Sequence, residues 1–193
     1  YNWVNVINPK VIKIIKRNPQ MMIFVGFFIY AFSLGAMFPR LDDIQTSLAI
    51  DKAELGFLLL CIPLGLQVTL VFADRLVRAI SLKNIICIGI PSICFMQFAA
   101  VAINQISFFA FFLIVCGAFV AVVEVAINLE ADRVEHALGS RIMNRSHAFW
   151  SIGFFLAAVV GALFSQFKVI LEIHFLLICI ISFVLTKIIF KDY

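Results

Sequence analysis

Six long runs of apolar residues, separated by short polar connections, dominate the pattern of this chain. The runs cover residues 20–38, 55–73, 85–103, 106–129, 147–165 and 169–190. At about 1.5 Å per residue, the 19 residues of the first run form a helix of about 28 Å, which matches a hydrocarbon core about 30 Å thick. Each run is therefore predicted to be a membrane-spanning helix.

The shortest connections fix how neighbouring helices run. Residues 104–105 and 166–168 leave room only for antiparallel neighbours, as in a hairpin-linked bundle. No run alternates like a barrel strand, which needs only about 9–11 residues, and none carries the polar stripe of a soluble amphipathic helix. The pattern predicts an all-α integral membrane protein built as a six-transmembrane-helix bundle.

The composition agrees with this class. Hydrophobic residues make up 64% of the chain and charged residues 13%, against about 45–50% and 25% in soluble domains. The lipid bilayer is therefore the expected partner, and the net charge of +4 comes without the basic, aromatic-rich surface of a nucleic-acid-binding protein. No metal or cofactor is expected, because the five cysteines lie inside apolar runs without metal-ligand or disulfide spacing: Cys61, Cys87, Cys94, Cys116 and Cys179.

The basic residues give the bundle a direction, because Lys and Arg accumulate in cytoplasmic connections. With the N-terminus inside, twelve of them lie on the cytoplasmic side: Lys10, Lys13, Lys16, Arg17, Arg75, Arg78, Lys83, Arg133, Arg141, Arg145, Lys187 and Lys191. Only Arg40, Lys52 and Lys168 lie outside. We expect a multi-pass protein of the inner membrane with both termini cytoplasmic, a basic interfacial N-terminus at 1–19 and a short cytoplasmic end at 191–193.

The connection between the second and third predicted helices carries a charged motif, LVFADRLVRA. It resembles the G-x-x-x-D-R-x-G-R-R motif of the major facilitator superfamily, with Asp74, Arg75 and Arg78 in matching positions. The copy is degraded at three positions: Leu70, Val77 and Ala79. The resemblance implies a cytoplasmic gate loop, in which charge-assisted hydrogen bonds lock one helix arrangement and release another. The alternative is that these charges only set topology.

A second resemblance, to one bacterial branch of the superfamily, covers residues 124–153. That branch has an acidic residue and an Asn at the inner end of its fourth helix, matched here by Glu124 and Asn128. It then has a His-x-x-Trp-Ser-x-Gly start of the fifth helix, matched by residues 147–153 (HAFWSIG). Counted together, the similar positions run from about residue 20 to residue 161.

The resemblance implies both a fold and a function. Six helices with both ends inside resemble the N-terminal half of the twelve-helix major facilitator fold, internally two inverted three-helix repeats at 20–103 and 106–190. The implied protein is a secondary active transporter that moves a small-molecule substrate by alternating access, with proton coupling as one option. Alternating access rocks one half against another, so we expect a C-terminal six-helix half to be missing and the chain to be a fragment or an interrupted gene product.

The predicted fourth helix carries a candidate cavity face. Four small or polar residues recur at steps of four, three and four and so share one side of the helix: Gly117, Ala121, Glu124 and Asn128. A charge at full membrane depth costs about 2.5–3.5 kcal/mol, so Glu124 needs water, a partner or a proton. The functional interpretation is a water-filled cavity for substrate or protons. The alternative is that Glu124 snorkels to the headgroups or pairs with Arg133.

The predicted fifth helix carries a stripe of small residues. Gly153, Ala157 and Gly161 repeat every four residues, a pattern that lets two membrane helices pack backbone to backbone. In the superfamily the second and fifth helices meet the opposite half, so the resemblance implies inter-half packing. Packing within this half is the alternative.

Other polar positions give weaker signals. Glu172 and His174 lie two residues apart near the outer end of the sixth helix, so they share no face and are expected to be interfacial. His147 is interpreted as an anchor at the start of the fifth helix. Pro63 and Pro91 are expected to kink the second and third helices.

Two other functions compete with transport. A non-transporting membrane adaptor or degenerate remnant would share this fold, and a downstream six-helix segment in the gene would argue against it. A six-helix intramembrane protease would need a nucleophile near Gly-x-Ser-Gly and a His on a nearby helix, whereas Ser146 and His147 are sequence neighbours at a cytoplasmic helix start. The chain is therefore not expected to be an enzyme, and no residue pattern indicates the substrate.

Overall fold

The computed structural model describes residues 18–190, and these residues form helices joined by short turns, without a strand. Six of the helical segments are long and apolar enough to cross a membrane. The predicted class, a six-helix all-α membrane bundle, is confirmed. The basic stretch of Lys10, Lys13, Lys16 and Arg17 and the end at 191–193, both predicted to be cytoplasmic, lie outside the described residues.

The first span is built from three consecutive helical pieces. α2 (Pro19–Gly35) begins with a proline, and the side chain of Asn18 accepts a hydrogen bond from the Gln20 amide at 3.1 Å, so the first turn is capped. The 3₁₀ turn η2 (Phe38–Arg40) and α3 (Leu41–Leu48) continue the chain beyond the predicted end of the run. The candidate span therefore reaches Pro19–Leu48.

The second span is interrupted near its start. α4 (Lys52–Leu59) begins with a capping box in which Asp51 and Glu54 each accept the other's backbone amide. α5 (Cys61–Ala79) follows after Leu60. The break lies where a kink was expected, because Pro63 cannot donate to the carbonyl four residues earlier and its ring crowds that carbonyl.

The other four spans are single helices: α6 (Leu82–Ile103), α7 (Ile106–Leu138), α8 (Met143–Gln166) and α9 (Leu171–Phe190). Pro91 lies inside α6, which continues through it. α6 and α7 end at residues with positive φ, Asn104 at 50° and Gly139 at 62°. These left-handed residues stop the helices and turn the chain back on itself.

The helices run further than the apolar stretches that predicted them. α7 continues nine residues past the predicted end at Leu129, to Leu138, and α5 includes the whole charged motif through Ala79. A charged side chain interrupts a hydrophobic run but not the backbone hydrogen-bond ladder, so charge alone does not mark a helix end.

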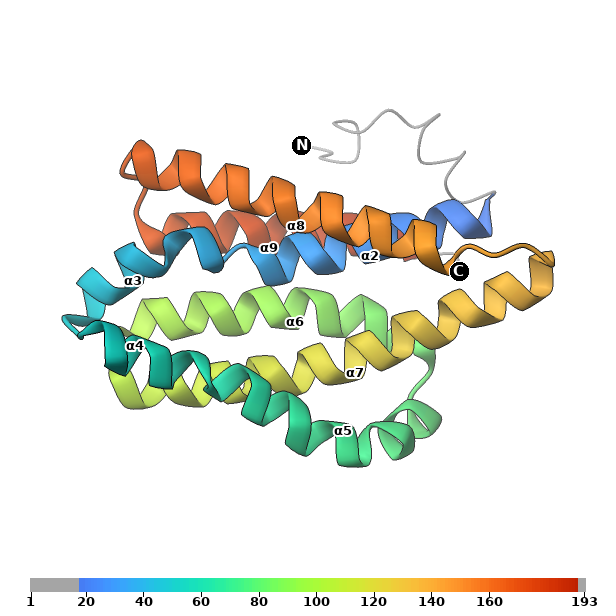
Figure 1. The fold of residues 1–193 in the computed structure, drawn as a ribbon, viewed down its shortest axis with the longest axis horizontal. Helices are drawn as coiled ribbons and strands as arrows, with labels where there is room; N and C mark the ends of the chain where they lie inside the picture. The colour runs from blue at the N-terminus through green and yellow to red at the C-terminus, as the bar shows by residue number, and fades with distance from the viewer. Residues whose placement is uncertain (1–17, 191–193) are drawn as a thin grey trace.

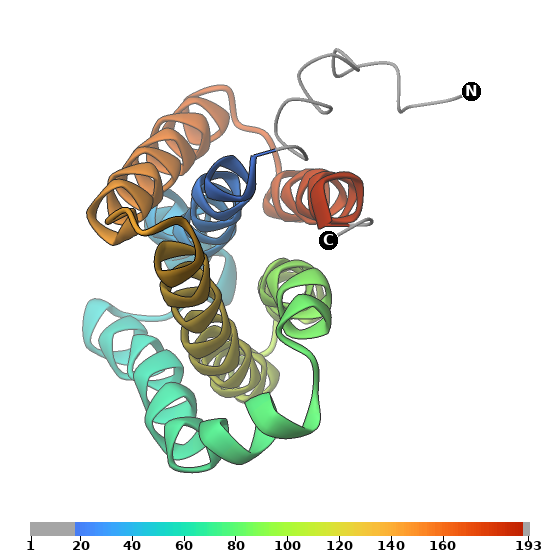
Figure 2. The same ribbon diagram turned by 90° about the vertical axis from the view of Figure 1, so that its right-hand side faces the viewer.

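The long helices lie roughly side by side along one direction (Figure 1). Viewed along that direction, α2 and α7 occupy the middle of the bundle, with α6 and α9 on one side and α5 and α8 on the other (Figure 2). The largest buried cluster joins α2, α6 and α7 with the end of α9. The bundle is thus organised around α2 and α7, the two helices that carry the polar pair described below.

Two helix pairs meet at close backbone distance. We call these contacts the α5–α7 seam and the α2–α8 seam. In the first, a Cβ added to Gly117 would lie 2.0 Å from the Ile62 carbonyl oxygen. In the second, a Cβ added to Gly153 would lie 2.4 Å from the Phe28 carbonyl oxygen. Only glycine lets the backbones approach so closely.

Candidate functional site

The polar face of α7 opens into a cavity of about 620 Å³ beside α5. Of the four predicted residues, Ala121, Glu124 and Asn128 line it, and Leu66 and Leu70 form the α5 wall. Gly117 does not line the cavity, because it is buried in the α5–α7 seam. The predicted stripe therefore has two parts, a packing contact at Gly117 and a cavity face that begins one turn later.

Glu124 is connected to the centre of the bundle by one side-chain hydrogen bond. The hydroxyl of Tyr30 on α2 donates to Glu124 Oε2 at 3.3 Å. Tyr30 is 2% exposed, whereas Glu124 is exposed to the cavity. The buried phenol thus holds one carboxylate oxygen at a fixed place while the other side of the carboxylate faces open space. One turn further along α7, the side-chain amide of Asn128 donates to the Glu124 backbone carbonyl at 2.8 Å.

The proposed pairing of Glu124 with Arg133 is not present. Arg133 Nη1 lies 3.8 Å from Glu130 Oε2, one turn away on the same helix. Glu130 is 4% exposed, so the arginine neutralises a more deeply buried carboxylate. Glu124 also lies fourteen residues before the end of α7 at Leu138, further from the helix end than its run of apolar neighbours indicated.

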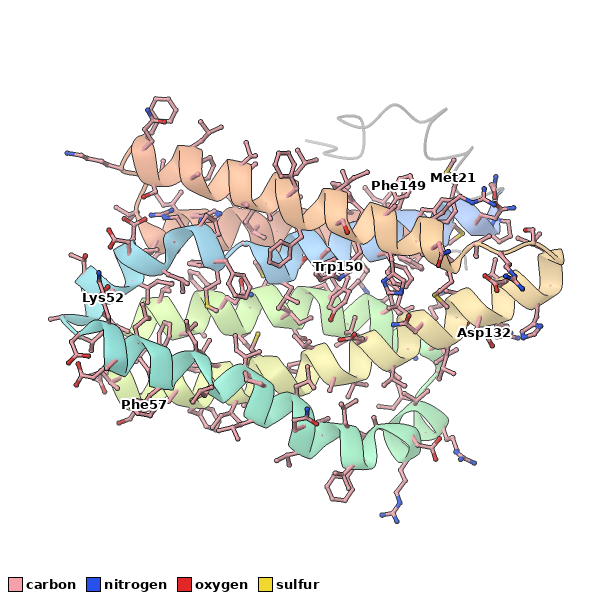
Figure 3. All side chains as sticks on the ribbon, viewed as in Figure 1. Met21, Lys52, Phe57, Asp132, Phe149 and Trp150 are labelled. Atoms are coloured by element: carbon pink, nitrogen blue, oxygen red, sulfur yellow. The ribbon has the colours of Figure 1, made fainter. Side chains whose placement is uncertain are left out.

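Asp132 extends the same face toward the α7–α8 connection and also lines the cavity (Figure 3). Its Oδ1 lies 3.6 Å from His136 Nε2. The lining residues of this cavity include two carboxylates and no basic side chain. Its field therefore favours positive charge, whether a proton or a cationic group of a solute.

The predicted gate charges lie on a helix rather than in a loop. Arg78 on α5 donates from Nε to Asp74 Oδ1 at 3.0 Å and from Nη2 to Oδ2 at 2.6 Å. Both side chains are largely exposed, at 78% and 73%, and Arg75 is exposed beside them. The prediction of a loop was wrong: α5 continues through the motif to Ala79. Asp74 and Arg78 are one helical turn apart, and an ion pair at this spacing stabilises the helix. In this structure the ion pair joins two positions of one helix and no second helix.

The small-residue stripe of α8 packs inside the bundle. Gly153 contacts the α2 backbone as described, Ala157 Cβ lies beside Gly35, and a Cβ added to Gly161 would lie 2.2 Å from Pro39. Gly153, Ala157 and Gly161 are all buried. The alternative of packing within this half is therefore the one observed, and the stripe is not available as a contact for another half.

A buried polar cluster at the opposite end of the bundle was not predicted. Arg40 is 3% exposed and pairs with Asp43, donates to the Val169 carbonyl at 2.7 Å and lies 3.3 Å from His174 Nδ1. His174 is fully buried rather than interfacial, because it packs between Phe164 and Phe175. We call this group the Arg40 cluster. It ties the first span to the α8–α9 connection and to α9.

Among residues 18–190, no group of three or more His, Cys, Asp or Glu side chains is placed to hold a metal ion. The cysteine thiols of this part of the chain are all free. The chemistry available around Glu124 is therefore that of a carboxylate, an amide and a phenol: hydrogen bonding, charge attraction and proton exchange.

The fold and this cavity define a class: a membrane bundle with a carboxylate exposed in a cavity beside its central helices. Comparison with known proteins narrows it. No family model matches the sequence, and no solved structure matches it significantly. An uncharacterized MFS-type transporter of Yersinia pestis is 28% identical over 138 residues, which is 72% of this chain and 35% of the relative.

An uncharacterized transporter of Sinorhizobium fredii is also 28% identical, over 160 residues, covering 82% of this chain and 42% of the relative. The predicted resemblance to the major facilitator superfamily is confirmed by these relatives together with the six apolar helices. The chain spans less than half the length of the curated relatives it matches.

Proposed function

We propose that this chain is one half of a secondary active transporter that moves a small solute across the inner membrane by alternating access, together with a second six-helix half. The observation that carries the proposal is the Tyr30–Glu124 hydrogen bond, which holds an exposed carboxylate beside the cavity between α5 and α7. Ionisable groups within membrane helices mark solute pathways and proton relays more often than they stabilise a fold. The transporter names of the relatives support the same class.

In this proposal Glu124 is the proton-coupling or substrate-contacting residue of this half. Its ionised form attracts a proton or a cationic group into the cavity. When Glu124 is protonated and neutral, the protein can change between its inward-open and outward-open states. Tyr30 is a positioning residue that keeps one carboxylate oxygen in place. Asn128 supplies a polar neighbour one turn away on the cavity face.

The test uses the complete transporter in proteoliposomes with a pH-sensitive dye trapped inside. A panel of sugars, amino acids, organic acids and organic cations is added until one drives proton movement by the unsubstituted protein. Glu124→Gln keeps the shape of the protonated acid, so it should insert normally but lose pH-dependent uptake while retaining binding or exchange. Glu124→Asp should be milder, and Tyr30→Phe should shift the pH midpoint with less loss of rate.

Glu172→Gln is the matched control, because it removes the same group from an exposed position on α9 outside the cavity. It should leave the pH profile unchanged. If Glu124→Gln transports at the unaltered rate and with the unaltered pH profile, Glu124 is only a structural carboxylate and the proposed coupling role is wrong.

We also propose that Asp74, Arg75 and Arg78 act as a cytoplasmic gate in the complete protein. The helix-borne pair leaves each charged group largely exposed, so either can exchange its partner for a group on a moving neighbour. Asp74→Asn should then change the balance of inward-open and outward-open states without changing membrane insertion. Unchanged cysteine accessibility on both faces would reduce the motif to a topology signal.

The competing functions receive less support. The Ser146 hydroxyl is fully buried and donates to the Ile142 carbonyl at 3.1 Å, while His147 meets the ring of Phe27 edge-on at 5.2 Å. A serine nucleophile needs a base within hydrogen-bond reach, and this pair does not provide one. A non-transporting adaptor predicts no solute-driven proton movement for any member of the panel.

A further inference from the structure

A basic cavity of about 670 Å³ lies where α5 ends and α6 begins. Arg78 from α5, Lys83 from α6 and Arg133 from α7 line it. Glu130 is the carboxylate in the lining and interacts with Arg133, and Asp74 pairs with Arg78 just outside. Three cations from three helices thus converge on a cavity with one buried carboxylate.

The two arginines of this cavity remain accessible. Their side chains are 78% and 77% exposed for Arg78 and Arg133. The pairs with Asp74 and Glu130 engage Nε and Nη2 of Arg78 and Nη1 of Arg133. A guanidinium carries five N–H donors, so both arginines can contact a further anion. A guanidinium also presents paired donors that match the oxygens of a phosphate group. The cavity is therefore suited to a phosphate that bridges more than one helix.

An apolar slot of about 430 Å³ begins at the same place. Ile80 lines both cavities, and the slot continues between α5, α6 and α7 along Leu76, Ile88, Ala118 and Phe119. Its volume lies within the roughly 300–1,000 Å³ typical of small-ligand sites. Leu76 and Ile88 are 37% and 61% exposed, so the slot is open along its side.

A basic cavity that continues into an apolar slot fits a molecule with an anionic head and a hydrocarbon chain. We propose that these two cavities bind one phospholipid with a net anionic headgroup. Its phosphate lies among Arg78, Lys83 and Arg133, and one acyl chain lies in the slot. The predicted orientation places this site at the cytoplasmic leaflet, where basic residues between membrane helices attract anionic lipid. The site is separate from the Glu124 cavity but shares Arg78 with the proposed gate. Its test measures lipid retention and so does not depend on transport activity.

Native mass spectrometry of the purified, delipidated protein tests the proposal. The protein is mixed with equal amounts of phosphatidylglycerol and phosphatidylcholine carrying identical acyl chains, and the retained lipids are counted. We expect one phosphatidylglycerol to be retained preferentially. The double variant Lys83→Gln with Arg133→Gln should lower that preference roughly tenfold or more, whereas Arg141→Gln with Arg145→Gln, matched in charge but outside the cavity, should leave it unchanged.

The slot is tested with Ala118→Phe, which fills it, against Val159→Phe on α8 as a control for added bulk. Only the first should reduce phosphatidylglycerol retention; Val115→Leu replaces it if the protein no longer elutes as a single helical species. Excess glycerol phosphate should not displace the lipid, because it lacks the chain.

Equal retention of both lipids, or an equal loss in the Arg141 and Arg145 control, would overturn the proposal. Displacement by glycerol phosphate, or full retention with the slot filled, would show a phosphate site without a lipid site and would overturn it as well.

Discussion

The α2–α8 and α5–α7 seams are corresponding contacts, yet they differ along their length. Each joins the first helix of one predicted three-helix repeat to the second helix of the other. The α2–α8 seam stays closed from end to end, with Phe24 stacked on Phe149, Gly153 in the middle and Gly161 against Pro39. The α5–α7 seam has its closest backbone approach at Gly65 and Gly117, and toward the C-terminal end of α5 the two helices diverge (Figure 1).

Three cavities lie along residues 66–80, where α5 and the residue that follows it diverge from α7. Similar glycine contacts therefore do not produce similar helix pairs. The course of the two helices beyond their glycine contact decides whether the pair encloses a cavity.

The largest expected effect concerns the side of the membrane that the diverging end of the α5–α7 seam faces. In a cysteine-free background, an impermeant thiol reagent added outside intact cells should label Asn104→Cys and leave Ser81→Cys unlabelled. The reason is the excess of basic residues at the end that carries Ser81. Labelling of Ser81→Cys alone would reverse the orientation and place the diverging end of the α5–α7 seam outside.

The stability of the end of the bundle beside the α2–α8 seam should depend strongly on the Arg40 cluster. Asp43→Ala leaves Arg40 buried without its carboxylate, and breaking a buried pair in this way costs about 3–5 kcal/mol. Asp42→Ala removes an exposed carboxylate from the same first turn of α3 and should change the free energy of unfolding by about 0.5 kcal/mol or less. Denaturant titration in mixed micelles measures both. Equal effects would mean that Arg40 is held by Val169 and His174 alone.

The glycine contact of the α2–α8 seam should come next. Gly153→Ala places a Cβ against the α2 backbone, so it should lower the free energy of unfolding by about 1–3 kcal/mol. Gly56→Ala adds the same methyl group where no atom lies within 4 Å, and it should be neutral or stabilising by up to about 1 kcal/mol. A stable Gly153→Ala protein would show that α8 can move away from α2.

The smallest effect is expected at the diverging part of the α5–α7 seam. Leu70 lines the Glu124 cavity and is 40% exposed, so Leu70→Ala should change stability by about 0.5 kcal/mol or less. Leu113→Ala, in the fully buried core, should cost about 2–5 kcal/mol by the same titration. A comparable loss at Leu70 would mean that this cavity is closed in solution.

The six spans could be predicted from the sequence because length and apolar content are local properties of each run. The ends of the helices were harder to predict. The charges at residues 130–135 ended the predicted run on α7, but the helix continues until Gly139 takes up a left-handed conformation. The glycine was the better signal, since it provides the conformation that a helix end requires.

Contacts between distant segments could not be predicted in the same way. A small-residue stripe indicates that a face can pack closely, but it does not identify the partner, and for Gly153 the partner is α2. The Tyr30–Glu124 bond joins residues 94 positions apart, and the Arg40–His174 contact joins residues 134 positions apart. A buried hydroxyl and a buried guanidinium both need partners, so Tyr30 and Arg40 could have been singled out, but not their partners.

Gly117 divides α7 into two arms of unequal length, like a lever with an off-centre pivot. Eleven residues separate it from the start of the helix at Ile106, and twenty-one separate it from the end at Leu138. At about 1.5 Å per residue these arms measure about 17 Å and about 32 Å. If α7 turns as a rigid rod about its contact with α5, a displacement at the Ile106 end is accompanied by nearly twice that displacement, in the opposite direction, at the Leu138 end. Glu124 lies on the longer arm, seven residues from the pivot.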